Sequence, residues 1–316
     1  MATDTGAVTG ALSRAAIKAG ESATDVAWDA GTVQAFPFMS ESIVEQKQVL
    51  HADALMGRRS RGKENSFAGT SAIGGSIETY ASPHILSNWI KAIVGDNATA
   101  VSGAIRYDIA DALDPFALLI DKRGAIFEYS GCQVNSATLS SAVDQVISLS
   151  FDVVGLQQNT ESSWDSNITA INTTLSNNPL VFSSLGLFLS SEGSVPAQSF
   201  TLSIDNALET YFTHGVLPTS IVPTDRIITL SVTVPYNATN HSSLYGGSDG
   251  AGILTLTNSS VEVQFNFAHL ALTKKTPVVS GRQTIGLDLE YQALSSAFVA
   301  GTHTTHEMYV TIDSTP

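Results

Sequence analysis

Alternation of apolar and polar residues is the dominant pattern along this chain. In the segment VISLSFDVV (146–154), every second residue is Ile, Leu, Phe or Val, and Ser or Asp lies between most of them. The segments IITLSVTV (227–234) and SVEVQFNF (260–267) repeat this pattern. A period of two is typical of strands with one buried face and one face open to water or to a partner. The sequence therefore predicts antiparallel sheets.

One segment, SPHILSNWIKAIVG, has helical spacing instead. Ser82 is suited to the N-cap, Pro83 to the first helical position and Gly95 to the position that ends the helix. We expect a helix over 82–94 with a structural role, packed across a sheet. Its apolar stripe consists of Ile85, Leu86, Trp89, Ile90 and Ile93.

These patterns divide the chain into an arm, two β regions and a linker. Residues 1–34 are predicted to be an N-terminal arm with a short helix near 11–19, and residues 157–178, which lack a strong pattern, a linker. We expect a first β-sandwich or barrel unit over 35–156 and a second β unit over 179–316. The predicted fold class is mainly β: an antiparallel β-sandwich or barrel with a flanking α-helix.

Within the first unit, FALLIDKRGAIFEY predicts a β-hairpin. Asp121 to Gly124 would form its turn, with Gly124 supplying a positive φ.

The two β regions share a weak internal repeat. FEYSGCQVNSATLSSAVDQVISLSFDVVG (127–155) aligns without gaps with FNFAHLALTKKTPVVSGRQTIGLDLEYQA (265–293). One interpretation is a duplication, which gives two similar β units per chain. The other is that any two alternating hairpins share this much. The identical pairs are Phe127/Phe265, Thr138/Thr276, Gln145/Gln283, Ile147/Ile285 and Leu149/Leu287.

Charge is scarce and unevenly placed. The 316 residues are 14% charged, against about 25% in typical soluble proteins, and their formal net charge is -14. We therefore expect other subunits to cover much of the surface. From Gly124 to Asp225 there is no Lys or Arg but there are nine carboxylates. A surface built from this region repels polyanions, which argues against nucleic-acid binding as the main activity.

One basic cluster departs from this composition. Arg58, Arg59, Arg61 and Lys63 lie in the segment MGRRSRGK. They could form a solvated loop, contact DNA, or meet carboxylates of another copy of the chain. We favour the contact between copies, because carboxylates of the same protein are the most abundant acidic partner, and bidentate Arg pairs would fix its register.

No segment predicts catalysis, a cofactor or a metal. HTTHEM places His303 and His306 three residues apart, which in a strand directs them to opposite faces. GTSAIGGS lacks the Lys-Ser/Thr ending of a phosphate-binding loop, and Cys132 is the single cysteine. No apolar run reaches the roughly 20 residues of a membrane span, and the first residues lack a secretory pattern, so we expect folding in the cytoplasm.

The order of several short motifs resembles that of phage tail tube proteins of long-tailed phages. The chain has the Glu-containing turn AIKAGESATD, PFMSES at 37–42, a Gly-Arg loop at 57–62, a glycine-led strand at 74–78 and a helix that ends at Gly95. The later segments 199–221 and 228–247 resemble the family's later strands and loop.

The resemblance implies a structural virion protein rather than an enzyme. Members stack as rings into a hollow tail tube through which the genome is ejected, and assemble in the host cytoplasm with other tail proteins and without a membrane. Since a ring of the family needs about six barrel units, a chain with two units implies a trimer, and a chain with one unit implies a hexamer. The alternative is a virion β-sandwich adhesin or carbohydrate-binding module.

For the tube, the lumen should be acidic or neutral. A positive lining would hold DNA, which carries one negative charge per roughly 1.7 Å of duplex, whereas an acidic lining lets DNA pass without specific binding. The Lys- and Arg-free region makes VISLSFDVVG a candidate lumen strand, and Asp144 and Asp152 are the candidate lumen-facing residues.

Overall fold

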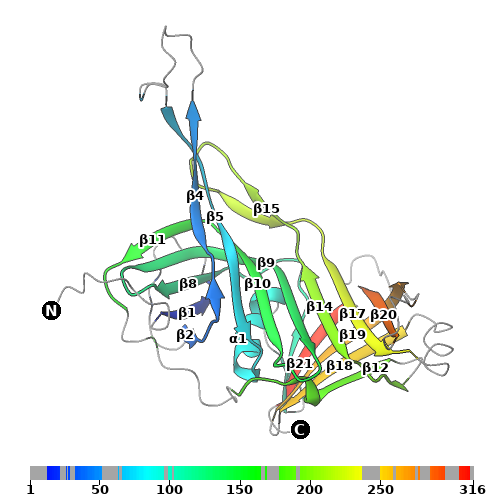
Figure 1. Ribbon diagram of the computed structural model, residues 1–316. Coiled ribbons are helices and arrows are strands. Elements are labelled where there is room, and N and C mark those ends of the chain that lie inside the picture. Colours follow the sequence, from blue (N-terminus) through cyan, green and yellow to red (C-terminus); the bar gives the residue numbers. More distant parts are fainter. Residues whose placement is uncertain are drawn as a thin grey trace.

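Antiparallel strands make up most of the protein, and the described residues contain one α-helix (Figure 1). The structure is a computed structural model. It describes residues 13–21, 26, 28, 33–51, 63, 66–95, 99–101, 103–164, 168, 178–189, 193–236, 250–258, 261–274, 277, 285–295 and 306–313.

The first half of the chain contains the helix and eleven of the described strands. They are β1 (Arg14–Ala19), β2 (Val33–Phe36), β3 (Ser40–Glu41), β4 (Val44–His51), β5 (Ser66–Tyr80), α1 (Pro83–Val94), β6 (Thr99–Val101), β7 (Ala104–Asp108), β8 (Phe116–Asp121), β9 (Ile126–Ala142), β10 (Ser148–Gly155) and β11 (Gln157–Glu161).

The second half begins, among the described residues, with a 3-10 turn at Phe182–Ser184 and continues as strands. They are β12 (Leu185–Leu189), β13 (Gly193–Ser194), β14 (Ser199–Asp205), β15 (Leu208–Tyr211), β16 (Ser220–Pro223), β17 (Ile227–Pro235), β18 (Gly250–Asn258), β19 (Val261–Lys274), β20 (Gly286–Leu294) and β21 (Met308–Asp313).

Strand pairing joins the two halves. A large sheet runs in the order β4, β5, β10, β9, β14, β17, β20 and β19, and β9 and β14 come from different halves. Further on, β19 pairs with β21, and β21 pairs with β7 of the first half. The N-terminal part of β9 instead pairs with β8 and β11, next to β1 and β2. The two predicted β units therefore share sheets and one hydrophobic core.

The predicted alternation is confirmed in each of the three segments that indicated it. In β10, β17 and the first part of β19, every apolar position of the pattern is buried, and the Ser, Thr, Asp, Glu, Gln and Asn positions face the other side. Burial of one face at each alternate residue fixes the strand register, because a shift by one residue would expose the whole apolar set.

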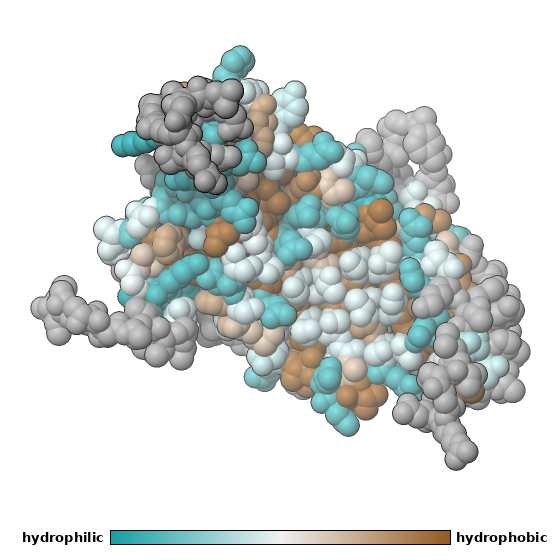
Figure 2. Space-filling model, turned by 45° about the horizontal axis from the view of Figure 1, so that its top comes forward, coloured by the Kyte–Doolittle hydropathy of each residue, from teal (hydrophilic) through white to brown (hydrophobic). Residues whose placement is uncertain are grey.

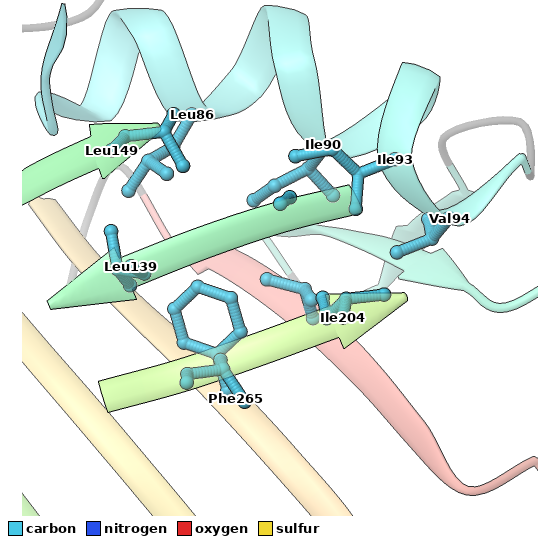
Figure 3. Close-up of a pocket in the computed structure, with 11 residues that line it drawn as sticks. Leu86, Ile90, Ile93, Val94, Leu139, Leu149, Ile204 and Phe265 are labelled. Carbon is cyan, nitrogen blue, oxygen red and sulfur yellow. The ribbon is translucent and has the colours of Figure 1, made fainter. Parts of the chain in front are cut away.

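Helix α1 fills the interior of the fold. Ser82 accepts a hydrogen bond from the Ile85 N–H at 3.3 Å, and Gly95 ends the helix with φ 85°. Figure 3 shows how the helix packs: Leu86, Ile90, Ile93 and Val94 face side chains of β9, β10, β14 and β19. All five residues of the predicted apolar stripe are buried, namely Ile85, Leu86, Trp89, Ile90 and Ile93.

Trp89 lies at the centre of this packing. Its ring meets Phe36 and Phe116 edge-on, with centroids 5.2 and 5.4 Å away, and lies 3.9 Å from the ring centroid of Phe151. These partners come from β2, β8 and β10, so the one side chain connects three strands that are distant in sequence. Edge-on aromatic pairs contribute roughly 0.5–1.5 kcal/mol each beyond the area that they bury.

The aligned repeat segments adopt the same backbone irregularities. In the β9–β10 hairpin the register shifts between the pairs Ser136–Asp152 and Val134–Val153. In the β19–β20 hairpin it shifts between Lys274–Glu290 and Leu272–Tyr291. The gap-free alignment that places Phe127 on Phe265 also places the two pairs of the first hairpin on the two pairs of the second, residue for residue. A β-bulge disrupts a ladder at one specific position, so matching bulges are stronger support for a duplication than a shared alternation of apolar and polar residues.

A second pair of bulges matches in the same way. In the β8–β9 pairing the register shifts between Phe116–Cys132 and Leu118–Tyr129, and in the β18–β19 pairing between Gly250–Leu270 and Gly252–Phe267. The same alignment places Cys132 on Leu270 and Tyr129 on Phe267. Strands β5, β10, β9 and β8 thus have counterparts in β17, β20, β19 and β18.

Three local predictions differ from the structure. The expected helix near 11–19 is wrong: the described part forms strand β1, because it pairs with β2 on one edge and β8 on the other. The turn of the β8–β9 hairpin takes its positive φ at Arg123 (65°) and not at Gly124. Asp121 accepts the Arg123 N–H at 2.7 Å, which holds that conformation. Strand β11 occupies the first residues of the predicted linker 157–178.

Candidate functional site: the polar face of the large sheet

One face of the large sheet is polar across six neighbouring strands, because each strand turns its alternate polar residues to the same side. We call this surface the polar face. Its hydroxyl residues are exposed or half-buried, while the residues between them are buried. The polar face consists of Ser76, Glu78 and Tyr80 of β5; Ser148, Ser150 and Asp152 of β10; Ser136, Thr138 and Ser140 of β9; Ser199, Thr201, Ser203 and Asp205 of β14; Thr229, Ser231 and Thr233 of β17; and Asp288, Glu290 and Gln292 of β20.

Strand pairing aligns these residues into rows that run across the sheet. One row starts at Glu78, passes through a Ser or Thr on each of β10, β9, β14 and β17, and ends at Gln292. In Figure 2, pale residues of intermediate hydropathy form a broad field in the middle of the molecule, in keeping with serine and threonine, and teal residues lie around it. The centre of the polar face is therefore covered mainly by small hydroxyl side chains.

Carboxylates give the polar face a negative charge. Three of them accept hydrogen bonds from hydroxyl groups of the neighbouring strand: Asp152 from Ser136 (2.9 Å), Asp288 from Thr233 (2.9 Å) and Glu78 from Ser40 (2.9 Å). A hydroxyl donor orients a carboxylate and leaves its charge in place. Lys274 of β19 lies opposite Glu290 in the strand register.

The two predicted lumen residues occupy different positions relative to this face. Asp152 lies within it, exposed, in the middle of β10. Asp144 lies in the turn that connects β9 to β10, with φ 63°, at the end of the sheet. The sequence interpretation did not name Glu78, Asp205, Asp288 or Glu290, although SFTLSID and GLDLEYQ carry the same alternation that identified Asp152.

The hairpin formed by β4 and β5 extends beyond the sheet (Figure 1) and leads to the basic cluster. Lys63 is exposed, whereas Arg58, Arg59 and Arg61 lie outside the described residues. At the base of the hairpin, Glu45 accepts a hydrogen bond from Ser71 (2.7 Å) and pairs with Lys47 (3.1 Å). Burial works against ionisation of Glu45, but these two donors outweigh it and lower the pKa of the carboxyl.

In the described part of the chain, the potential metal-ligating side chains are not gathered into a site. Within this part, no three His, Cys, Asp or Glu side chains are grouped so that they could hold a metal ion. His306 is half-buried, and its predicted neighbour His303 lies outside the described residues. Burial raises the pKa of the Cys132 thiol, which opposes a role as a nucleophile. Across the described ranges, no helix is long and apolar enough to cross a membrane.

Comparison with known proteins identifies the family. No curated protein matches the chain. A family model described as phage tail tube protein matches residues 6–293, which include the helix, the polar face, the first predicted β unit and residues 179–293 of the second. This match covers most of the 316 residues and agrees with a mainly β, antiparallel fold. The chain therefore belongs to the phage tail tube protein family.

Proposed function

We propose that this structural protein of the phage tail polymerises as stacked rings into a tube, and that the polar face lines its lumen. The observation that carries the proposal is the polar face itself: six neighbouring strands with hydroxyls in rows and carboxylates among them, in a chain that matches the tail tube family. A tube of this kind conducts the genome during ejection and has no catalytic step.

Electrostatics support the polar face as the lining. Duplex DNA carries one negative charge per roughly 1.7 Å, and each contact with Lys or Arg would release counterions and hold the DNA in place. Carboxylates such as Asp152 prevent this attraction. In this arrangement Asp152 faces the channel, and Asp144 lies at the end of the sheet, near the mouth of each ring.

The matched bulges support a ring of three chains. Four strands of the first half have counterparts in the second half, with irregularities at equivalent positions. A duplicated chain supplies two similar β units, so three chains supply the six units of a ring. A ring of six chains would contain twelve such units, which is more than rings of the family need.

The basic cluster fits a contact between copies rather than a contact with DNA. The β4–β5 hairpin, whose connection contains Lys63, extends beyond the other strands of the sheet (Figure 1), and Arg58, Arg59 and Arg61 belong to the same connection in the sequence. Arg side chains pair with carboxylates through two parallel hydrogen bonds, which fixes orientation as well as affinity. The excess of carboxylates over cations in a chain with net charge -14 makes another copy the natural acidic partner.

The lumen assignment is tested by introducing positive charge into one row. In the variant Ser150→Arg/Thr138→Arg/Ser203→Arg, assembled tubes should retain double-stranded DNA in a co-sedimentation assay at low salt, whereas wild-type tubes leave it in solution. Salt should release the DNA, because counterion release drives the binding. The control variant Ser150→Asn/Thr138→Asn/Ser203→Asn has bulkier side chains without charge. If tubes of the Arg variant leave the DNA in solution, as wild-type tubes should, the lumen assignment is refuted.

The basic cluster is tested by changing Arg58, Arg59, Arg61 and Lys63 to Ser together. Electron microscopy of negatively stained protein should show loss of tubes, while circular dichroism shows a folded monomer. The control changes Arg123, an exposed cation on a different turn, to Ser. Normal tubes from the fourfold variant would contradict a contact between copies.

A further inference from the structure

The outer part of the β4–β5 hairpin is a ribbon of two strands. From Ile73 onwards β5 also pairs with β10, but along residues 66–72 no described strand other than β4 pairs with it. At the same level the register of β4 and β5 shifts between Lys47 and Val49. A β-bulge of this kind bends a strand, and an isolated two-stranded ribbon is only marginally stable in water. The hairpin therefore has its bend where the large sheet stops supporting it.

A second hairpin, from the other half of the chain, reaches this bend. Strands β15 and β16 form a two-stranded sheet of their own, which leans from the second half towards β4 and β5 (Figure 1). In the loop between them, the Val216 carbonyl oxygen accepts a hydrogen bond from the Ser71 N–H at 2.7 Å. Ser71 lies opposite Lys47, next to the bulge, and is 3% exposed, and Pro218 of the loop is buried. The contact between the two hairpins therefore lies at the bend itself.

The base of the β15–β16 hairpin is held firmly. The buried amide of Asn206 donates to two backbone carbonyl oxygens, one in α1 and one in β9, at 3.1 and 3.0 Å. Ala207 has φ 43°, a conformation that residues other than glycine adopt only when their surroundings impose it. Here the Asp205 carboxylate accepts the Ala207 N–H (2.9 Å), and the Thr224 hydroxyl donates to the Ala207 carbonyl oxygen (2.7 Å). These bonds fix the direction in which the hairpin leaves the sheet.

The matched bulges make the two hairpins counterparts of each other. β10 and β20 are equivalent strands, and β5 and β17 pair with them in the same register. β4 precedes β5 and pairs with it as β14 precedes β17 and pairs with it. Residues 47–71 of the first half therefore correspond to residues 206–226 of the second. The first of these segments extends away from the sheet, and the second lies against the first (Figure 1).

We propose that the β15–β16 hairpin is a clamp that fixes the direction of the β4–β5 hairpin, and with it the position of the basic cluster, before two copies of the chain meet. The role of the clamp in assembly rests on the proposed contact between copies. A ribbon free to bend at the bulge would present the basic cluster in many directions, and association would have to select one of them. A ribbon already held at Ser71 loses less conformational freedom on association, so the copies bind at a lower concentration.

Shortening the loop between β15 and β16 tests the clamp. Tyr211 and Ser220 lie directly opposite each other, so the dipeptide Asn-Gly can replace residues 212–219 as a tight turn that no longer reaches β5. Spin labels on Phe67→Cys and Asp152→Cys, both exposed positions, report the distance between the hairpin and the sheet by double electron–electron resonance. Below the assembly concentration, the distance distribution should be narrow with the native loop and broad with the short loop. An equally narrow distribution with the short loop would overturn the proposal.

Two further variants complete the test. Val216→Ala/Leu217→Ala is the matched control: it removes two exposed apolar side chains of the loop but keeps the carbonyl oxygen that binds β5, so its distance distribution should equal that of the native loop. Inserting Gly-Ser-Gly between Phe212 and Thr213 loosens the loop without removing any residue, and serves if the short-loop protein does not fold. In both loop variants, amide hydrogens of residues 66–71 should exchange roughly tenfold faster than in the native protein, and unchanged exchange would contradict the clamp.

Assembly measured on the same proteins separates this inference from the proposed function. The loop variants should need a roughly tenfold higher concentration than the native protein to form tubes, as seen by electron microscopy of negatively stained samples. If the β4–β5 hairpin loosens but the assembly concentration stays the same, the role of the clamp in assembly is wrong and the proposed function stands. If the native protein forms no rings or tubes at any concentration, the proposed function is overturned, and the distance measurement on the monomer still decides whether the clamp exists.

Discussion

Trp89 allows the packing and the hydrogen bonding of the core to be measured separately. Its side chain is 0% exposed and contacts rings of three strands, as described above. Trp89→Ala removes these contacts and leaves a cavity beneath a helix that strands hold on several sides. Large-to-small changes of this kind cost about 3–5 kcal/mol. In a chain of 316 residues this corresponds to a fall in Tm of roughly 5–8 °C.

Trp89→Phe should cost much less, for a reason specific to this site. The indole Nε1 is buried and has no hydrogen-bond partner in the described part of the protein. A buried donor without a partner costs about 1–3 kcal/mol, so wild-type folding already includes this penalty. Phenylalanine keeps the edge-on aromatic contacts and removes the donor. The cost of the lost side-chain volume and the gain from removing the unsatisfied donor largely cancel, so the free energy of unfolding should fall by less than about 1.5 kcal/mol.

Urea unfolding followed by far-UV circular dichroism would compare the three proteins. Dichroism is preferable to fluorescence because the substitution removes a tryptophan, and the protein should be kept below its assembly concentration so that association does not add to stability. Equal free energies of unfolding for Trp89→Phe and Trp89→Ala would refute the reasoning, since they would mean that the Nε1 donor is satisfied in solution.

Three further substitutions test other parts of the fold. Gly95→Ala should lower the free energy of unfolding by about 2 kcal/mol or more, because φ is 85° and a Cβ would lie 2.4 Å from the Ala112 carbonyl oxygen. Gly20→Ala, where φ is 72° and a Cβ would have no atom within 4 Å, should cost about 1 kcal/mol. Equal losses for the two variants in thermal melts would contradict this reasoning. Asn206→Ala should cost about 2–3 kcal/mol by urea unfolding, since its buried amide donates to two backbone carbonyls, and a loss below 0.5 kcal/mol would contradict this. Burial lowers the pKa of His84, so below about pH 6.5 the unfolded chain binds a proton that the folded protein does not, and the free energy of unfolding falls as the pH falls. His84→Gln should reduce the dependence of this free energy on pH between about pH 7 and 5.5. An unchanged dependence would contradict the prediction.

The period-two pattern predicted the strands and their buried faces because that information is local. In β10, the alternation alone assigned Phe151 to the core and Asp152 to the surface, and the structure confirms both positions. The helix was also predictable, since Ser82, Pro83 and Gly95 act on the backbone within one turn of each end. Each of these signals depends on residues close together in the sequence.

The partners of the strands could not be predicted in this way. Nothing local to β14 indicates that it pairs with β9, more than fifty residues earlier, so the extent of the polar face was missed. The same reason explains β1. Its alanines favour a helix locally, but the segment forms a strand because it pairs with β2 on one edge and with β8 on the other. At the β8–β9 turn, a side-chain hydrogen bond from Asp121 outweighs the intrinsic preference of glycine for positive φ.

The bond between the two halves has a kinetic consequence. Since β9 and β14 belong to one polypeptide, their junction forms during folding and does not depend on protein concentration. In a ring of three chains, half of the six junctions between β units are therefore already made before any two molecules meet. Nucleation of a ring then requires three molecules to come together rather than six, so tubes can begin to grow at a lower concentration of subunits. In such a ring, every second junction between β units forms within one polypeptide and needs no encounter between molecules.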